Sequence, residues 1–190
     1  MSQSAPIDSR QESVAIPQRL LTRIPLPLRM LVYGVAFLAL MLVGLPALFF
    51  QLDLLIPQIH FEIGLWRWVG VALFAGFLAA YLACSYVLTS RGQGAYVEFD
   101  PPTKLVVVGP YRYTRNPVAA TLMGAILGLA IALSSTGVLL MFVIFSGLAH
   151  LQVLRVEEPL LMQRYGADYE AYCRTVPRWL PRLGRAPALD

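Results

Sequence analysis

Long apolar stretches alternate with short polar segments along this chain and predict membrane-length helices. The predicted spans cover residues 30–50, 66–88, 118–133 and 137–154. A helix needs roughly 20 residues to cross about 30 Å of hydrocarbon, so the last two predicted spans lie at the short end of that range. The pattern therefore predicts an all-α fold, an integral membrane helical bundle of about four transmembrane helices with a cytoplasmic C-terminal helix.

The third and fourth predicted spans are joined only by Ser134, Ser135 and Thr136. So short a connection requires a tight antiparallel hairpin, which brings the other two ends of these spans close together. The alternative is a re-entrant hairpin that does not cross the bilayer.

The positive charges lie on one side of the predicted bundle. The termini and the 89–117 loop carry every lysine and arginine except Arg67, whereas the 51–65 loop carries only Asp53 and Glu62 as charged residues. Lysine and arginine accumulate in cytoplasmic loops of membrane proteins. We therefore expect a multi-pass protein of the cell inner membrane with both termini cytoplasmic. Arg67, flanked by two tryptophans, can extend its side chain to the outer interface.

The polar ends divide the chain into an N-terminal cytoplasmic segment, residues 1–29, and a membrane domain, residues 30–190. No apolar core follows the start at signal-peptide distance, so we expect no cleaved signal. The cytoplasmic cap, residues 155–190, has apolar and aromatic residues at helical spacings interrupted at Gly166, which predicts one surface helix or two short ones. Trp179 between arginines has the composition of an interface anchor.

Composition supports the membrane assignment. Hydrophobic residues make up 57% of the 190 residues and charged residues 14%, against about 25% charged in an average soluble domain. Cys84 and Cys173 offer neither a disulfide framework nor a metal-ligand spacing, and we expect both to be reduced. The sequence has no phosphate loop, dinucleotide fingerprint or metal cluster, so neither a metal nor a nucleic acid is an expected partner.

A basic and aromatic segment, residues 109–117, directly precedes the third predicted span. Pro117 fits the first turn of that helix, and Asn116 is placed to cap its N-terminus. With Arg112 and Arg115 adjacent, this helix end suits a carboxylate or a phosphate. The alternative is that both arginines contact lipid headgroups.

Two adjacent acidic residues, Glu157 and Glu158, follow the end of the fourth predicted span. Carboxylates near a bilayer are costly unless they are paired or functional. These two could bind hydroxyls, amines or a cation of a ligand. Alternatively, they form structural salt bridges with Arg112, Arg115 or Arg155. His150 lies two helical turns before Glu157 on the same face, where ligand contact and packing against a carbonyl are both open.

The second half of the chain carries these motifs in a fixed order: Lys104-Leu105-Val106, Gly109-Pro110-Tyr111-Arg112-Tyr113, Arg115-Asn116-Pro117, His150, Glu157-Glu158, Tyr165-Gly166, Tyr169, Tyr172 and Val176-Pro177-Arg178. Arg91-Gly92 and Phe99-Asp100-Pro101-Pro102 precede them. In this combination the chain resembles the isoprenylcysteine carboxyl methyltransferase and phospholipid methyltransferase family, in its bacterial branch. The resemblance covers about Arg91 to Arg182.

The resemblance implies a membrane methyltransferase that uses S-adenosylmethionine and acts on a lipophilic small molecule or lipid at the cytoplasmic face. By position, the implied cofactor-binding residues are Lys104, Leu105, Val106, Tyr111, Arg112, Asn116, Pro117, His150, Glu157 and Glu158. Arg115 and Glu157 are the implied catalytic residues, with Glu157 holding a polar group of the cofactor and Arg112 or Arg115 its carboxylate. Methyl transfer mainly requires positioning and exclusion of water, which fits a sequence with no metal or nucleophile motif.

The chain departs from the family pattern at four positions. Asn116 stands where many members have histidine, and asparagine is familiar in the bacterial branch. Ala119 and Thr121 stand where tyrosine and glycine are common. Val153 aligns with the arginine that contacts the acceptor in the eukaryotic enzymes, which argues against a prenylcysteine substrate or leaves that role to Arg155. Two other hypotheses stay open: an NADPH-dependent membrane reductase of the sterol-reductase type, and a non-catalytic membrane subunit on the same scaffold. The acceptor atom and the oligomeric state are left open as well.

Overall fold

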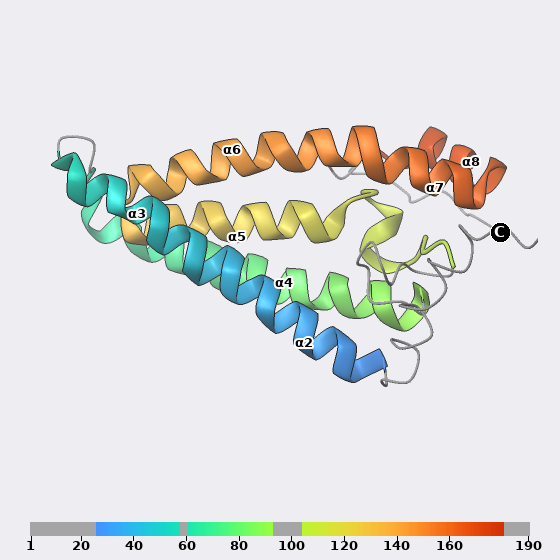
Figure 1. The fold of residues 1–190 in the computed structure, drawn as a ribbon, viewed down its shortest axis with the longest axis horizontal. Helices are drawn as coiled ribbons and strands as arrows, with labels where there is room; N and C mark the ends of the chain where they lie inside the picture. The colour runs from blue at the N-terminus through green and yellow to red at the C-terminus, as the bar shows by residue number, and fades with distance from the viewer. Residues whose placement is uncertain (1–25, 58–60, 93–103, 181–190) are drawn as a thin grey trace, which may run out of the picture.

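A computed structural model of the protein describes residues 26–57, 61–92 and 104–180. All regular secondary structure in these ranges is helical, so the prediction of an all-α bundle is confirmed. The elements are α2 (Leu26–Ala39), η1 (Leu40–Gly44), α3 (Leu45–Leu55), η3 (Gly64–Trp66), α4 (Arg67–Gly92), η4 (Gly109–Arg112), α5 (Pro117–Leu133), α6 (Thr136–Gln152), η5 (Val153–Glu157), α7 (Glu158–Tyr165) and α8 (Ala167–Thr175). Figure 1 shows the long helices side by side, with α7 and α8 beyond one end of the bundle.

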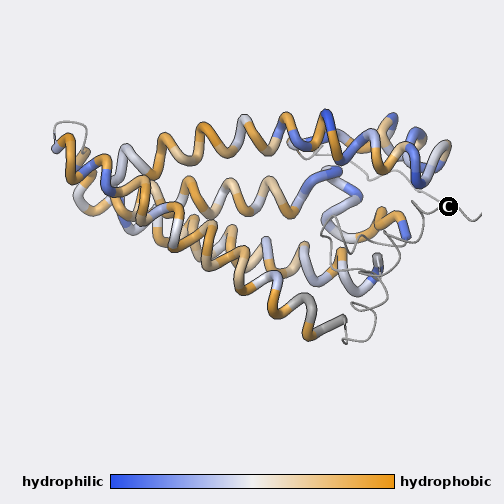
Figure 2. The backbone as a smooth tube through the Cα atoms, viewed as in Figure 1, coloured by the Kyte–Doolittle hydropathy of each residue, from blue (hydrophilic) through white to orange (hydrophobic). Residues whose placement is uncertain are grey.

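Three helical segments are long and apolar enough to cross a membrane by length and composition: Leu31–Leu55, Gly64–Gly92 and Thr136–Tyr165. The apolar helix α5 is shorter, at 17 residues. Large apolar side chains such as those of Leu31, Val35 and Val143 are exposed on the outside of the bundle. Hydrophilic residues gather instead at the end that carries α7, α8 and the loop before α5 (Figure 2). This distribution is that of a membrane bundle with a polar site at one end.

Two of the long helices contain a π-helical turn that ends two residues before a proline. The turn η1 precedes Pro46, and the turn η5 precedes Pro159. A proline inside a helix loses one backbone hydrogen bond and clashes with the preceding turn. A widened turn relieves this clash, so each helix continues past its proline.

The continuation changes two predicted boundaries. The first helix extends past residue 50 to Leu55, so Asp53 lies inside α3 and not in a loop. The fourth extends past residue 154 through Glu157 and Glu158 to Tyr165. There Gly166, at φ +52°, takes a left-handed conformation that favours glycine, and α8 starts in a new direction.

Asp53 joins α3 to the start of α6. Its carboxyl group accepts hydrogen bonds from the Ser135 hydroxyl and from the backbone N–H of Thr136 (3.1 Å) and Gly137 (3.3 Å). Ser135 also caps α6, because its hydroxyl accepts a hydrogen bond from the N–H of Val138 at 3.0 Å. Asp53 and Ser135 are both buried, at 4% and 0% exposure, so these bonds satisfy groups that water does not reach.

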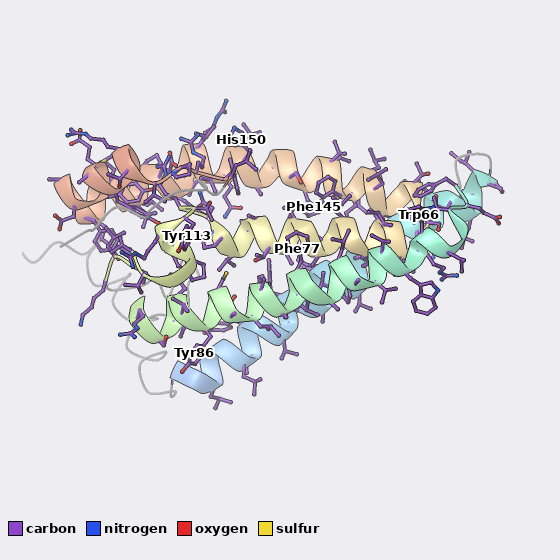
Figure 3. The ribbon with its side chains drawn as sticks, turned by 180° about the vertical axis from the view of Figure 1, so that it is seen from behind. Trp66, Phe77, Tyr86, Tyr113, Phe145 and His150 are labelled. Atoms are coloured by element: carbon purple, nitrogen blue, oxygen red, sulfur yellow. The ribbon has the colours of Figure 1, made fainter. Side chains whose placement is uncertain are left out.

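Glycines let α4 and α5 approach closely. A Cβ atom added at Gly128 would lie 2.5 Å from the backbone nitrogen of Phe74, and one added at Gly70 would lie 2.3 Å from that of Ala132. Gly124 leaves room in the same way for the ring of Phe77. Figure 3 shows Phe77 between these two helices. Small residues four apart commonly allow such close packing between membrane helices.

The central core lies among α3, α4, α5 and α6. Its buried residues are Tyr81, Leu122, Ile126, Ala130, Val138 and Met141, and the rings of Phe49 and Phe145 pack edge to face against each other beside them. From this core the helices spread apart toward the end where the loop before α5 lies (Figure 1). The core therefore fixes the ends of α4, α5 and α6 that carry the candidate site.

Candidate functional site

The segment before η4 is extended and connects the bundle to the C-terminal cap. The N–H of Lys104 donates to the carbonyl oxygen of Gly92 at 3.3 Å, at the end of α4. Leu105 and Val107 pack against an aromatic cluster of the cap, whereas Val106, between them, is buried at 6% exposure. Alternate side chains of an extended chain point to opposite sides, which explains this division.

The aromatic cluster consists of the buried residues Tyr169, Tyr172 and Val176, on α8 and just after it. The hydroxyl of Tyr172 donates to the carbonyl oxygen of Tyr111 in η4 at 2.6 Å. Burial, followed by the proximity of Tyr169, raises the pKa of Tyr172, so its phenol stays protonated as a donor. Tyr172 therefore ties α8 to the loop that precedes α5.

The substitution Tyr172→Phe tests this tie. It removes the hydroxyl, keeps the ring and leaves the Tyr111 carbonyl without this buried donor, so we expect a loss of about 1–2 kcal/mol in the free energy of unfolding. Thermal unfolding in detergent, followed by circular dichroism, measures the change. Tyr165→Phe is a suitable comparison, because Tyr165 borders the same cluster but is only partly buried. An unchanged midpoint for Tyr172→Phe would show that this hydrogen bond adds nothing to stability.

Three consecutive residues of the loop before α5 (residues 104–116) bind the backbone of the C-terminal tail, the residues 176–180 that follow α8. The N–H of Arg115 donates to the carbonyl oxygen of Pro177 at 2.9 Å. The Thr114 hydroxyl (2.9 Å) and the Asn116 side-chain amide (3.2 Å) both donate to the carbonyl oxygen of Arg178. The predicted capping role of Asn116 is therefore wrong: its side chain makes no cap hydrogen bond to α5 and binds the tail.

Glu158 is the centre of an ion-pair cluster. Both oxygens of its carboxylate bind the Arg178 guanidinium at 2.8 Å, and the Arg115 guanidinium lies 2.9 Å away. The same Arg115 nitrogen donates to the sulfur of Cys173 at 2.6 Å. Hydrogen bonding to Glu158 raises the pKa of Arg178. A bidentate pair has defined geometry, so this cluster fixes α7, the loop and the tail relative to one another.

Glu157, the neighbour of Glu158, lies in a different environment. Its side chain is half-buried, and it forms no hydrogen bond or ion pair with any residue in the described ranges. It is the last residue of the π-helical turn η5. Such turns inside α-helices frequently occur at functional sites. Of the two adjacent carboxyl groups, one is therefore neutralised and the other is available to a ligand.

His150 contacts the tail rather than Glu157. The indole N–H of Trp179 donates to Nδ1 of His150 at 3.0 Å, and the two rings lie 6.0 Å apart. Figure 3 shows His150 and Tyr113 toward the same end of the molecule, with Trp66 at the other. The prediction that Trp179 anchors the tail at an interface omitted this partner.

The structure brings several of the predicted site residues together. Arg115 contacts Glu158, and Asn116 binds the carbonyl oxygen of Arg178, whose side chain also binds Glu158. Tyr111 is bound by Tyr172 of α8, Pro117 begins α5, and Glu157 directly precedes Glu158. Lys104 and Arg112 have exposed side chains for which the structure gives no partner within the described ranges. Val153 is buried at 2% exposure, whereas Arg155 is exposed. The motif Phe99-Asp100-Pro101-Pro102 lies outside the described residues.

Sequence reasoning missed the residues of the tail and one of the loop. Thr114, Cys173 and Arg178 complete the cluster, yet none was a candidate site residue. Arg178 gave the only usable signal, because Val176-Pro177-Arg178 was part of the family resemblance. Spacing could not have paired it with Glu158, 20 residues earlier in the chain, because that contact requires the reversal at Gly166.

Fold and site together define a class: a helical membrane bundle with a polar, partly enclosed site where one long helix, the loop before α5 and the tail converge. The sequence model of the phospholipid methyltransferase family matches residues 65–168, more than half of the chain. The chain therefore belongs to the phospholipid methyltransferase family, and the predicted resemblance is confirmed. No curated protein and no solved structure matches it. Membership implies methyl transfer and a lipid-like acceptor.

Proposed function

We propose that the protein transfers a methyl group from S-adenosylmethionine to a lipophilic or amphipathic acceptor at the cytoplasmic face of the cell inner membrane. The observation that carries this proposal is the half-buried carboxyl group of Glu157, which has no partner among the described residues. It lies in a chain whose family consists of methyltransferases. The asymmetric distribution of lysine and arginine supports the orientation.

The chemistry of the available groups fits the cofactor. S-adenosylmethionine has hydroxyls, an amine and a carboxylate, and when bound it supplies an activated methyl group. Glu157 would accept a hydrogen bond from a hydroxyl or the amine. The exposed Arg112 is better placed than Arg115 to meet the carboxylate, because the Arg115 guanidinium already contacts Glu158 and Cys173. Tyr111, Asn116 and Pro117 would form the wall beside Glu157.

The chain's own contribution to methyl transfer is positioning. In-line displacement requires the acceptor atom and the methyl group to be aligned and water to be kept out. The loop and α7 are each linked to the tail by hydrogen bonds, so together they can hold such an alignment without a nucleophilic side chain. Arg115, predicted to be catalytic, would act here by holding Glu158.

The reductase hypothesis has less support at one of its two arginines. It requires arginines that are open to the phosphates of a nicotinamide cofactor. Arg115 is instead paired with Glu158, whose charge opposes a phosphate, whereas the exposed Arg112 is open to either cofactor. The buried Val153 gives no cation for a carboxylate-bearing acceptor, which favours an acceptor other than a prenylcysteine. The exposed Arg155 stays the alternative cation for a prenylcysteine.

We expect Glu157→Ala to weaken binding of S-adenosylhomocysteine by about 1–3 kcal/mol, because a polar group of the ligand loses its buried partner. This corresponds to about 5–150-fold in Kd. Isothermal titration of purified protein in detergent measures it, with Asp168→Ala as the matched control, since Asp168 is an exposed acid on α8. Equal Kd values for the two variants would assign Glu157 a structural role. No binding by the folded unmodified protein would refute the proposed function, and NADPH would be the next titrant.

A further inference from the structure

Arg178 has contacts that the family match does not cover, because the matched residues end at 168. Its guanidinium binds both oxygens of Glu158 on α7, and its carbonyl oxygen accepts hydrogen bonds from Thr114 and Asn116 in the loop. One residue of the tail therefore contacts both the loop before α5 and α7, the helix that directly follows Glu157. These segments are far apart in the sequence, and Arg178 joins them through its side chain on one hand and its backbone on the other.

We infer that Arg178 is a positioning residue for the proposed cofactor site, acting on Glu157 through Glu158 and on the loop through its own carbonyl group. This inference rests on the proposed function. Glu157 and Glu158 are consecutive, so a constraint on the Glu158 side chain also fixes the rotation of the turn that carries Glu157. Glu157 is the last residue of that turn, the π-helical η5, and Glu158 is the first residue of α7.

Arg178 also affects the charges of the two acidic residues. Two adjacent carboxylates repel each other, and a ligand that needs one of them ionised binds best when the other is neutralised. Arg178 and Arg115 together neutralise Glu158, whereas Glu157 pairs with no cation among the described residues. Without Arg178, Arg115 would be the remaining cation beside Glu158, and Arg115 also binds Cys173. The division of roles between the two acids therefore depends on Arg178.

The fluorescence of Trp179 can report on the position of the tail. Trp179 follows Arg178 directly and donates a hydrogen bond to His150, so its surroundings depend on where the tail lies. The other two tryptophans, Trp66 and Trp68, lie in and beside η3 at the far end of the bundle and are exposed at 73% and 65%. In a Trp66→Phe, Trp68→Phe background, fluorescence and its quenching by acrylamide report on Trp179 alone.

The experiment compares Arg178→Gln with Arg174→Gln in this background. Arg174 is the matched control, because it forms an ion pair with Glu170 on α8. That pair is exposed and lies outside the Glu158 cluster. For Arg178→Gln we expect about tenfold weaker binding of S-adenosylhomocysteine and at least about twofold stronger quenching of Trp179 without ligand. For Arg174→Gln we expect neither change, since exposed pairs contribute little. Equal Kd and equal quenching for both variants would overturn the inference.

Two further variants separate positioning from general stability. Arg178→Lys keeps the charge but not the bidentate geometry. We expect it to fold with an almost unchanged midpoint of thermal unfolding and to have a Kd between those of the unmodified protein and Arg178→Gln. If Arg178→Lys had the same Kd as the unmodified protein, the inference would be overturned. This test holds even if Arg178→Gln does not fold. We also expect Arg178→Gln to have a smaller effect on Kd when Glu158→Gln is already present, because the two residues act as one unit.

Binding of S-adenosylhomocysteine by the unmodified protein distinguishes a failure of this inference from a failure of the proposed function. If the unmodified protein does not bind S-adenosylhomocysteine, the proposed function is refuted, and with it the role of Arg178 toward the cofactor. If the unmodified protein binds and Arg178→Gln binds equally well, only the positioning role is refuted.

Discussion

Replacing Asp53 with alanine is expected to lower the free energy of unfolding by about 2–4 kcal/mol, although Asp53 lies at the opposite end of the bundle from the site. The substitution removes the acceptor for the hydroxyl of Ser135 and for the N–H groups of Thr136 and Gly137. These donors are partly or fully buried, so water replaces the lost partner poorly. The N-terminus of α6, where the helix dipole is positive, also loses a favourable acidic group.

Thermal unfolding in detergent measures this effect as a decrease in the midpoint of about 5–15 °C. Glu62→Ala is the matched control, because Glu62 is an exposed acid on the same side of the bundle and should leave the midpoint unchanged. Asp53→Asn keeps one acceptor oxygen and should have a smaller effect than Asp53→Ala. If the alanine variant unfolded at the same temperature as the Glu62 control, the buried carboxyl group would not hold α3 to α6.

Gly137→Ala is expected to be at least as disruptive, by about 3 kcal/mol. A Cβ atom at this position would lie 2.0 Å from the carbonyl oxygen of Phe49 and 2.8 Å from its carbonyl carbon. Both are backbone atoms of α3, so no side-chain rotation relieves the overlap and one helix must move. Such a movement would also separate Asp53 from the N–H of Gly137.

Gly147 provides the control for this substitution. It lies on the same helix, α6, and a Cβ atom there would meet nothing within 4 Å. Gly147→Ala should therefore leave the protein as stable or slightly more stable, because alanine favours the helix over glycine. The same melting experiment compares the two variants. Equal midpoints would show that α3 can move away from α6 without cost.

Hydropathy predicted the helical bundle because the long helices are apolar over a membrane-spanning length. It failed at the helix ends, where it treated polar residues as loops. Asp53 is a charged residue type in an apolar helix, and its hydrogen-bond partners come from α6, 82 to 84 residues later. Glu157 and Glu158 likewise continue a helix past its apolar part. Periodicity within one segment contains no information on such partners.

The candidate site was predicted in composition and in part of its pairing: the alternative of a salt bridge between the acidic pair and Arg115 is confirmed for Glu158, whereas Arg178 was not a candidate. The hairpin of α5 and α6 correctly indicated that the loop and the acidic pair are near each other. Which arginine binds which acid depends on the reversal at Gly166, which turns α8 and brings the tail back to the loop. The sequence marked an interruption at Gly166 but not its direction. The choice of Arg178 over Arg112 or Arg155 therefore required coordinates.

The shortness of α5 has a consequence for how an acceptor would be handled. A helix of 17 residues rises about 25 Å, less than the roughly 30 Å of hydrocarbon in a typical bilayer. In the proposed orientation, the end of α5 next to the loop would therefore lie near the depth of the lipid headgroups, and not above them in water. An acceptor with acyl or isoprenoid chains could keep those chains in the leaflet while its polar atom is methylated. Turnover would then be supplied by lateral diffusion within the membrane, without a step that extracts the lipid.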